Sequence, residues 1–254
     1  MLFMKLKELT DLLNTELGVE EFKEIDISLN GLQVGDEELE VKKIAFAVDA
    51  CQATIEKAID NCCNLLIVHH GLFWGKPLSL TGAHLQRVKT LLDNNMGLYA
   101  CHLPLDASSK YGNNISMAKA LELEDVQKFG WYHSKQIGFS GRLKEPLSSN
   151  EIINKLGIKN EGVRVLSFGK DKIQTVGIIS GGAPYEVNEA LKDGLDAYIT
   201  GECAHEVYHT CEEGKINMIC LGHYSSETFG VKAVKAFLED KGITAVFVDV
   251  PTYL

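Results

Sequence analysis

Imidazole and carboxylate side chains recur where apolar runs of this sequence come to an end. Together these two donor types suit zinc, iron, manganese or cobalt. Six such side chains exceed what one ordinary metal site needs, whereas two ions sharing a bridging carboxylate would use most of them. The sequence therefore predicts a dinuclear metal centre. The candidate donors are His69, His70, His102, Asp106, His223 and Glu227.

Two of these donors are adjacent, in the stretch "LLIVHHG". Neighbouring side chains on a strand point to opposite faces, so His69 and His70 can reach one site only if the backbone turns beside them. Gly71 permits such a turn. We expect the two imidazoles to bind different metal ions.

The other four donors occur as two similar pairs, in "CHLPLD" and "GHYSSE". Pro104 separates His102 from Asp106, which predicts an irregular loop instead of a helical turn. Ser225 or Ser226 is a plausible N-cap, which would place Glu227 in the first turn of the last helix. The alternative for Glu227 is an ordinary first-turn acid.

A competing donor set lies in "CAHEVYHTC", with Cys203, His205, His209 and Cys211. On a helix the two histidines share a face, and a Cys2His2 zinc site is conceivable. The spacing matches no zinc-finger pattern. We therefore rank this set below the strand-end donors.

Strand-like and helical patterns alternate along most of the chain, which predicts βαβ units and largely parallel pairing. Between about residues 128 and 170 the pattern is instead typical of an antiparallel insertion. The expected strands that matter for the donors are 41–50, 64–70, 96–106, 173–182, 195–202 and 216–223.

The two halves of the chain share this pattern. The segments 44–70 and 176–202 match in apolar pattern without gaps, and each half ends its third strand with a histidine followed by an acid. Open α/β sheets bind ligands at the carboxyl ends of their strands. We therefore predict two related, interlinked α/β lobes with mixed, largely parallel sheets and a metal site between them. The first lobe, with most of the ligands, is predicted at 1–127 plus 221–254, and the second at 128–220.

Composition limits the classes of function. The formal net charge of −10 argues against a broad nucleic-acid surface. The start of the chain reads as an amphipathic helix, neither a signal peptide nor a membrane span. Seven cysteines without a signal sequence indicate a reducing compartment, so a cytoplasmic protein is expected, with cysteines such as Cys62, Cys63, Cys101 and Cys220 filling the core.

Five motifs in order, "DISLNGLQVG", "LLIVHHGLFWG", "ACHLPLD", "AYITGE" and "GHYSSETFG", resemble the YbgI-like family of dinuclear-metal proteins, also called GTP cyclohydrolase 1 type 2 homologues or Nif-three-like proteins. The resemblance spans nearly the whole chain. It implies a toroidal homohexamer and places His102 next to the metals. The ligands that it implies are His69, His70, Asp106, His223 and Glu227.

The function expected from these residues is that of a metal-dependent hydrolase acting on a small, nucleotide- or phosphate-like substrate. His102 would move a proton or hold a water, or be purely structural. Glu202 aligns with His70 and is expected to face the site, the alternative being a helix-capping acid for 203–212. The loop 28–35 is a candidate pocket wall. The alternative function is a non-catalytic, ring-forming regulatory or interaction protein that binds metal.

Overall fold

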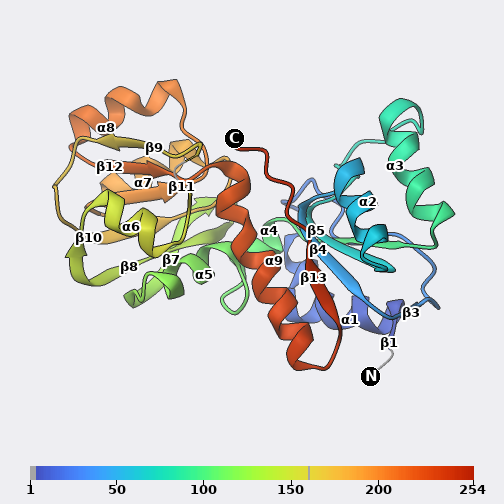
Figure 1. Cartoon of the computed structure of the whole chain (residues 1–254). Helices are drawn as coiled ribbons and strands as arrows, with labels where there is room; N and C mark the ends of the chain where they lie inside the picture. Colours follow the sequence, from blue (N-terminus) through green and yellow to red (C-terminus); the bar gives the residue numbers. More distant parts are fainter. Residues whose placement is uncertain (1–3, 160) are drawn as a thin grey trace. The chain divides into compact units, whose positions relative to one another are not determined.

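The apolar runs of the sequence form the central strands of two sheets, each covered by helices (Figure 1). The computed structural model describes residues 4–159 and 161–254. These residues form two compact units. Unit 1 runs to Leu105 and resumes over Val231–Val250, whereas unit 2 is Asp106–Gly230 with Pro251–Leu254.

The sheet of unit 1 has the strand order β13-β4-β5-β6-β2. The first four strands pair in parallel, and β2 is an antiparallel edge strand. The short strands β1 (Met4–Lys5) and β3 (Glu40–Val41) pair separately. The five strands are β2 (Gly31–Val34), β4 (Ile44–Asp49), β5 (Leu65–His70), β6 (Gly97–Ala100) and β13 (Ala245–Phe247).

Helices cover both faces of this sheet because apolar residues occupy both faces of its central strands. Alternate residues such as Ala47 and Val68 share a core with α2 and α3. Tyr99 points to the opposite face, where its hydroxyl donates to Asn14 of α1. The helices are α1 (Leu6–Leu17), η1 (Val19–Phe22), α2 (Gln52–Asp60) and α3 (Gly82–Asp93); α4 (Leu103–Ala107) and α9 (His223–Asp240) each cross the boundary between the units.

The sheet of unit 2 has the order β7-β8-β10-β11-β12-β9. Parallel pairing is confined to β10, β11 and β12 in the part of the unit that the structure describes. Its strands are β7 (Glu124–Tyr132), β8 (Lys135–Leu147), β9 (Arg164–Ser167), β10 (Ile173–Ile178), β11 (Ala197–Thr200) and β12 (Asn217–Cys220). Its helices are α5 (Asn113–Ala120), α6 (Ser149–Lys155), η2 (Pro184–Glu186), α7 (Val187–Lys192), η3 (His205–Val207) and α8 (Tyr208–Gly214).

The predicted class, α/β with mixed, largely parallel sheets, is confirmed as α/β with mixed, partly parallel sheets. The antiparallel segment expected near 128–170 is the β7–β8 hairpin with its pairing to β10. "Largely parallel" describes unit 1 only. Cys62 is exposed, contrary to its expected burial, whereas Cys63, Cys101 and Cys220 are buried.

The two sheets pair their central strands in the same register. In unit 1 Ile44 lies opposite Leu65, and in unit 2 Val176 lies opposite Ala197. The same sequence offset separates Ile44 from Val176 and Leu65 from Ala197. The register therefore agrees with the internal match between 44–70 and 176–202.

The unit boundaries differ from the predicted lobes 1–127 plus 221–254 and 128–220. Residues 106–127 lie with unit 2 because Ile115 and Met117 of α5 share a core with Phe139 and Val176 of its sheet. The start of α9 also lies with unit 2. As a result unit 2 contains Asp106, His223 and Glu227, and unit 1 contains His69 and His70.

Candidate metal centre

The end of β5 and the segment after β6 bring three imidazoles together in unit 1. The ring centroids of His69 and His70 are 4.7 Å apart, and those of His69 and His102 are 5.2 Å apart. One ring nitrogen from each of the three histidines lies within 4.8 Å of one from the others. Such a separation suits nitrogen donors of a metal site. Trp74 borders the group, with its ring centroid 5.1 Å from that of His102.

Each of these imidazoles is held by its Nδ1 atom. The Nδ1 of His69 lies 2.9 Å from the Cys101 carbonyl oxygen. The Nδ1 of His70 lies 2.8 Å from Asp49 Oδ1, and the Nδ1 of His102 lies 2.9 Å from Asp26 Oδ1. A metal would therefore be bound through Nε2, with the ring oriented by its oxygen partner.

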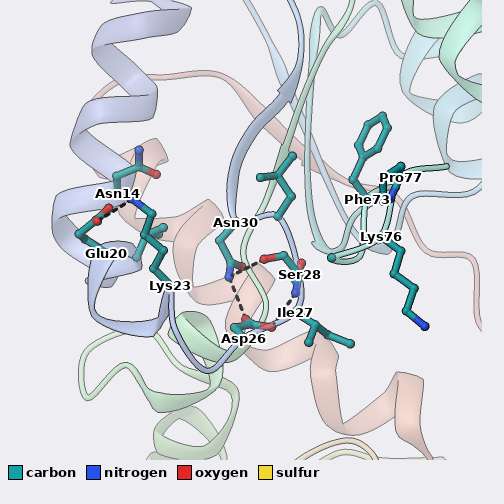
Figure 2. Close-up of a pocket in the computed structure, with 13 residues that line it drawn as sticks. Asn14, Glu20, Lys23, Asp26, Ile27, Ser28, Asn30, Phe73, Lys76 and Pro77 are labelled. Carbon is teal, nitrogen blue, oxygen red and sulfur yellow. Dashed lines mark hydrogen bonds and ion pairs between the residues drawn. The ribbon is translucent and has the colours of Figure 1, made fainter.

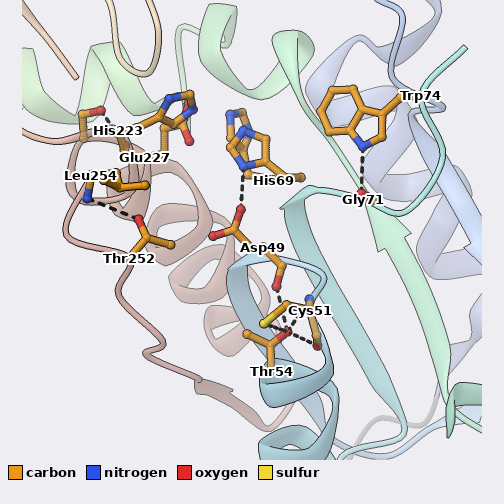
Figure 3. A network of polar contacts seen from close by, with 12 residues as sticks. Asp49, Cys51, Thr54, His69, Gly71, Trp74, His223, Glu227, Thr252 and Leu254 are labelled. Atoms are coloured by element: carbon orange, nitrogen blue, oxygen red, sulfur yellow. Dashed lines mark hydrogen bonds and ion pairs between the residues drawn. The ribbon is translucent and has the colours of Figure 1, made fainter. Parts of the chain in front are cut away.

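Strand pairing explains the partner of His70. Asp49 is the last residue of β4 and lies opposite His70 in the parallel register. His69 instead leans toward β6, where Cys101 follows the strand. Thus His70 bonds to the strand on one side of β5, and His69 bonds to the segment that follows the strand on its other side. Their rings nevertheless stay close. Figure 3 shows Asp49 below His69, next to the Cys51–Thr54 hydrogen bonds that begin α2.

Gly71 has a different role from the predicted backbone turn. Its backbone is not among those with a positive φ. A Cβ atom at this position would lie 2.3 Å from Gln33 Nε2. Gln33 accepts a hydrogen bond from the Leu72 amide and donates one to the Leu29 carbonyl, both 2.7 Å long. Glycine is therefore needed for close packing of Gln33. The Gly71 carbonyl also accepts from Trp74 Nε1 (Figure 3).

Asp26 is the partner that orients His102. Its Oδ1 accepts from the Ser28 amide, and its Oδ2 accepts from Asn30 Nδ2 and from the Leu103 amide. Burial raises the pKa of Asp26, but His102 and the other donors outweigh burial and hold it below the usual value. Asp26 is therefore a buried carboxylate that orients the His102 ring through its Nδ1 atom.

The loop 28–35, a candidate pocket wall from its sequence, contributes Ser28, Leu29 and Asn30 to the lining of a cavity of about 670 Å³ in unit 1. Figure 2 shows the other walls, which come from α1 and η1 and from the segment 73–77.

Asp106 of unit 2 lies in helix α4, so the predicted irregular loop is wrong. Pro104 is tolerated because it occupies the second position of the helix, where its missing N–H costs no hydrogen bond. Asp106 is 5% exposed. Its Oδ1 accepts from Asn113 Nδ2 at 2.8 Å and from the Ser180 hydroxyl at 2.9 Å. These two hydrogen bonds fix the orientation of the carboxylate that a metal would take.

His223 lies between two carboxylates of unit 2. Its Nδ1 is 2.5 Å from Glu202 Oε1, and its Nε2 is 3.1 Å from Glu227 Oε1. Burial lowers the pKa of His223, but the stronger effect of Glu227 and Glu202 raises it to about 9. The metal-free imidazole is therefore protonated at neutral pH, and a metal at Nε2 would replace that proton.

The helix that carries this pair begins earlier than expected. α9 starts at His223, so Glu227 lies one turn later on the same face and neither Ser225 nor Ser226 is its N-cap. Ser226 instead accepts from the Gly181 amide and donates to the His223 carbonyl. Gly181 has φ +68°, and a Cβ atom there would lie 2.3 Å from Glu227 Oε1. Glycine thus leaves room for the carboxylate.

Glu202 does not cap a helix. The helical residues after it begin at His205, and neither η3 nor α8 has a side-chain cap. Instead Glu202 contacts His223, as Asp49 contacts His70. Its carboxylate also lies about 3.5 Å from the position that a Cβ atom would take at Gly182.

The competing set of Cys203, His205, His209 and Cys211 does not come together as a group of three or more donors in the described residues. His209 pairs with Glu212 on the surface. Burial raises the pKa of the Cys211 thiol to about 11, which disfavours the thiolate that binds metal.

The donor set therefore fits divalent metal ions. Histidines oriented through Nδ1 by oxygen acceptors, together with buried carboxylates, are the usual ligands of zinc, iron, manganese and cobalt. The outer partners Asp26, Asp49, Asn113 and Ser180 were not predicted. Asp49 ends a predicted strand at the same edge as His70, and that position was the available signal.

Comparison with known proteins shows which proteins this chain resembles over nearly its whole length. The family model described as Duf34/NIF3 (NGG1p interacting factor 3) matches residues 4–252. A relative from Archaeoglobus fulgidus named "GTP cyclohydrolase 1 type 2 homolog" is 42% identical over 252 residues, which cover 99% of this chain and 100% of the relative. One of the same name from Deinococcus radiodurans is 40% identical, covering 90% of this chain and 88% of the relative.

Two solved structures have the same fold. A structure titled as protein ybgI of unknown function is 32% identical, with a TM-score of 0.89 over 99% of this chain and 100% of that chain. TTHA1606 from Thermus thermophilus is 39% identical, with a TM-score of 0.87 over the same shares.

Proposed function

The chain belongs to the Duf34/NIF3 family, and from this membership we propose that it is a metal-dependent hydrolase with a dinuclear centre. The proposed cofactors are two divalent ions per chain, of zinc, iron, manganese or cobalt. The proposed substrate is a small nucleotide- or phosphate-containing molecule. The proposed ligands are His69, His70, Asp106, His223 and Glu227.

One observation carries the proposal. Each of the four site histidines uses its Nδ1 for an oxygen partner, which is a carboxylate for His70, His102 and His223 and a carbonyl for His69. Repeated orientation of this kind is the arrangement that fixes imidazole ligands on metals. The exposed His209 also contacts a carboxylate through Nδ1, but within the described residues it belongs to no group of three or more donors.

Two bound ions would supply a water of lowered pKa and polarise the bond to be attacked. The chain's own contribution is positioning and proton movement. Asp26 holds His102 so that Nε2 would exchange a proton with substrate or water. Glu202 orients His223 and, in the proposal, tunes the site without binding metal.

The proposal includes further features that the resemblance suggests. They are a homohexameric assembly and a cytoplasmic location. The described part of the chain contains no helix both long and apolar enough to cross a membrane.

A second candidate is a non-catalytic metal-binding regulator. The family description names an interacting factor, and the ybgI structure is titled as one of unknown function. A hydrolase must lose turnover when its metals are removed, whereas a regulator need only lose binding or assembly.

Metal analysis of the protein purified without chelator tests the centre. We expect up to two transition-metal ions per chain, fewer in His223→Ala and in Asp106→Asn. Asn at position 106 retains an oxygen for Asn113 and Ser180, which limits damage to the fold. The control is His205→Ala/His209→Ala. Full occupancy in the ligand variants, or loss only in the control, would reject the proposed ligands.

Turnover tests the reaction. Phosphate- and nucleotide-bearing substrates should be hydrolysed by protein of known metal content, and the rate should fall after EDTA treatment and return with the metal. A panel without any metal-dependent turnover would favour the regulator.

A further inference from the structure

Helix α5 of unit 2 begins with two asparagines that have no exposed surface. Asn113 and Asn114 are both 0% exposed. Asparagine is favoured at the start of a helix because its side chain can bond to the backbone of that helix. Here both side chains bond instead to other segments of unit 2. Their burial at the start of α5 therefore has a cause outside the helix.

The Asn113 side chain joins a candidate metal ligand to helix α9. Its Nδ2 donates to Asp106 Oδ1 at 2.8 Å, and its Oδ1 accepts from the Gly230 amide at 2.6 Å. A carboxylate only accepts hydrogen bonds and a backbone amide only donates them, so a reversed side-chain amide would lose both bonds. The two partners therefore fix the orientation of Asn113, and Asn113 in turn fixes their separation.

The face of α9 that Asn113 contacts carries the other two candidate ligands of unit 2. Gly230 lies three residues after Glu227 and seven residues after His223 in this helix. Residues at these spacings share one face of an α-helix. Asn113 thus connects the Asp106 carboxylate to the helix face from which His223 and Glu227 project.

A second connection runs in parallel through the segment after β10. The Ser180 hydroxyl donates to the same Asp106 oxygen at 2.9 Å, and the Ser180 amide donates to Asn114 Oδ1 at 2.7 Å. The next residue, Gly181, donates its amide to the Ser226 hydroxyl of α9 at 3.0 Å. Asp106 is therefore joined to α9 twice, with one asparagine of α5 in each connection.

This network lies beside an apolar core. Ile115 and Met117, later in α5, belong to the hydrophobic core of unit 2. Polar groups buried next to such a core are costly unless all of them have partners, and a fully bonded network holds its members in one arrangement. A fixed arrangement of supporting groups is what a metal centre requires around its ligands.

We propose that Asn113 is a positioning residue of the metal centre, which sets the spacing between the Asp106 carboxylate and the helix face of His223 and Glu227. The inference rests on the proposed metal centre and adds to it a residue that does not bind metal. Ligands that are already spaced lose less freedom when the ions bind, which raises the affinity for metal. A purely structural network would instead contribute to stability alone.

Titration of the EDTA-treated, full-length protein with Co²⁺ tests this role. Competition with a chelator gives the affinity, and the visible absorption spectrum of bound Co²⁺ reports on its ligands. Asn113→Ala should lower the affinity about 10- to 100-fold and change the spectrum, because Asp106 loses a donor and its link to Gly230. Ser180→Ala leaves that link intact and should lower the affinity by a smaller factor.

Asn217→Ala is the matched control. Asn217 is 2% exposed and lies in unit 2, where its side chain bonds to the Gly169 amide at 2.9 Å and to the Lys170 carbonyl at 2.7 Å. Both alanine variants should unfold at lower urea concentration than the unaltered metal-free protein, whereas only Asn113→Ala should change the affinity and the spectrum of Co²⁺. If Asn113→Ala does not fold, Asn113→Ser serves in its place, because a hydroxyl is too short to reach both partners of the amide.

The possible results separate this inference from the proposed centre. Unchanged Co²⁺ affinity and spectrum in the Asn113 variant, or equal changes in Asn217→Ala, overturn the positioning role and leave the ligands in place. Failure of the unaltered protein to bind any divalent ion rejects the centre, and the positioning role with it.

Discussion

His223 combines two opposing influences within a single side chain. Burial disfavours its charged form, whereas the carboxylates of Glu202 and Glu227 favour it and raise its pKa to about 9. The imidazolium and these carboxylates form a charge cluster in the metal-free protein. The stability of that form must then depend on pH.

We expect EDTA-treated protein to lose stability in alkaline solution. The pKa of His223 rises from 6.5 in the unfolded chain to about 9 in the folded one, so its stabilising effect is complete below pH 6.5 and is lost as the pH passes 9. The loss should be about 2 kcal/mol, allowing for partial exposure. Urea unfolding at pH 6 and pH 9.5 measures it. His223→Gln should flatten the profile, and His209→Gln should not; an unchanged slope in His223→Gln contradicts the assignment.

Glu202 gives a second prediction for a single residue. Glu202→Gln keeps the shape of the side chain but weakens its hold on His223 Nδ1. We expect two metal ions still to bind, with affinity lowered about tenfold in competition with a chelator. Glu212→Gln removes the carboxylate of a comparable but surface pair with His209 and should leave affinity unchanged. If both substitutions changed the metal affinity equally, Glu202 would act on the site no more than a surface carboxylate does.

At the scale of elements, Gln33 joins β2 to the segment after β5. Its amide accepts from Leu72 and donates to Leu29, and it packs where a side chain at position 71 would lie. One glutamine thus links the loop 26–30 to the end of the strand that carries His69 and His70. The packing of Gly71 and the hydrogen bonds of Gln33 therefore depend on each other.

A double-mutant cycle tests this dependence between Gly71 and Gln33. Gly71→Ala should lower the free energy of unfolding by about 1–3 kcal/mol, because Gln33 must give up its hydrogen bonds. In a Gln33→Ala background the same substitution should cost much less, because the obstructing amide is absent. Chemical denaturation of the four proteins gives the coupling. If the two substitutions lower the free energy of unfolding additively, Gly71 and Gln33 are not coupled in this way.

The strands of the site were predictable, and the starts of its helices were not. The apolar run that ends at His70 shows where β5 ends, because burial on both faces leaves a pattern without periodicity, but the strand expected at 96–106 ends at Ala100. Pro104 and Ser225 misled the prediction, since a proline fits the first turn of α4 and α9 begins without a serine cap. Asp26 escaped notice because its hydrogen bond to His102 joins residues far apart in sequence.

At the scale of the whole molecule, the two sheets pair their central strands in equivalent registers. This indicates that the two units share one pattern of strand pairing but carry different candidate metal-binding residues. The end of β5 supplies imidazoles, whereas the segment after β11 supplies Glu202. Several large apolar side chains remain exposed in the single chain: Ile27, Leu29, Leu78, Leu80, Leu85 and Leu92. Exposed groups of this kind are typical of association surfaces.

Sedimentation tests association. Burial of exposed apolar side chains between chains, together with the resemblance to a toroidal family, leads us to expect a hexamer at micromolar concentration. Sedimentation equilibrium at several loading concentrations gives the mass. The mass of a single chain at every loading concentration would reject the hexamer. The assignment of metal ligands would stand, because it concerns residues of one chain.

The division of unit 1 into two sequence segments has a consequence for synthesis on the ribosome. When translation has reached Gly230, unit 2 lacks only its last four residues, but the sheet of unit 1 still lacks β13. Until Ala245–Phe247 emerge, the edge of β4 that pairs with them stays open, and β4 is almost wholly apolar and buried in the finished sheet. An unpaired edge of this kind recruits other strands. The nascent chain therefore carries this open edge throughout the synthesis of the segment Asp106–Gly230 of unit 2.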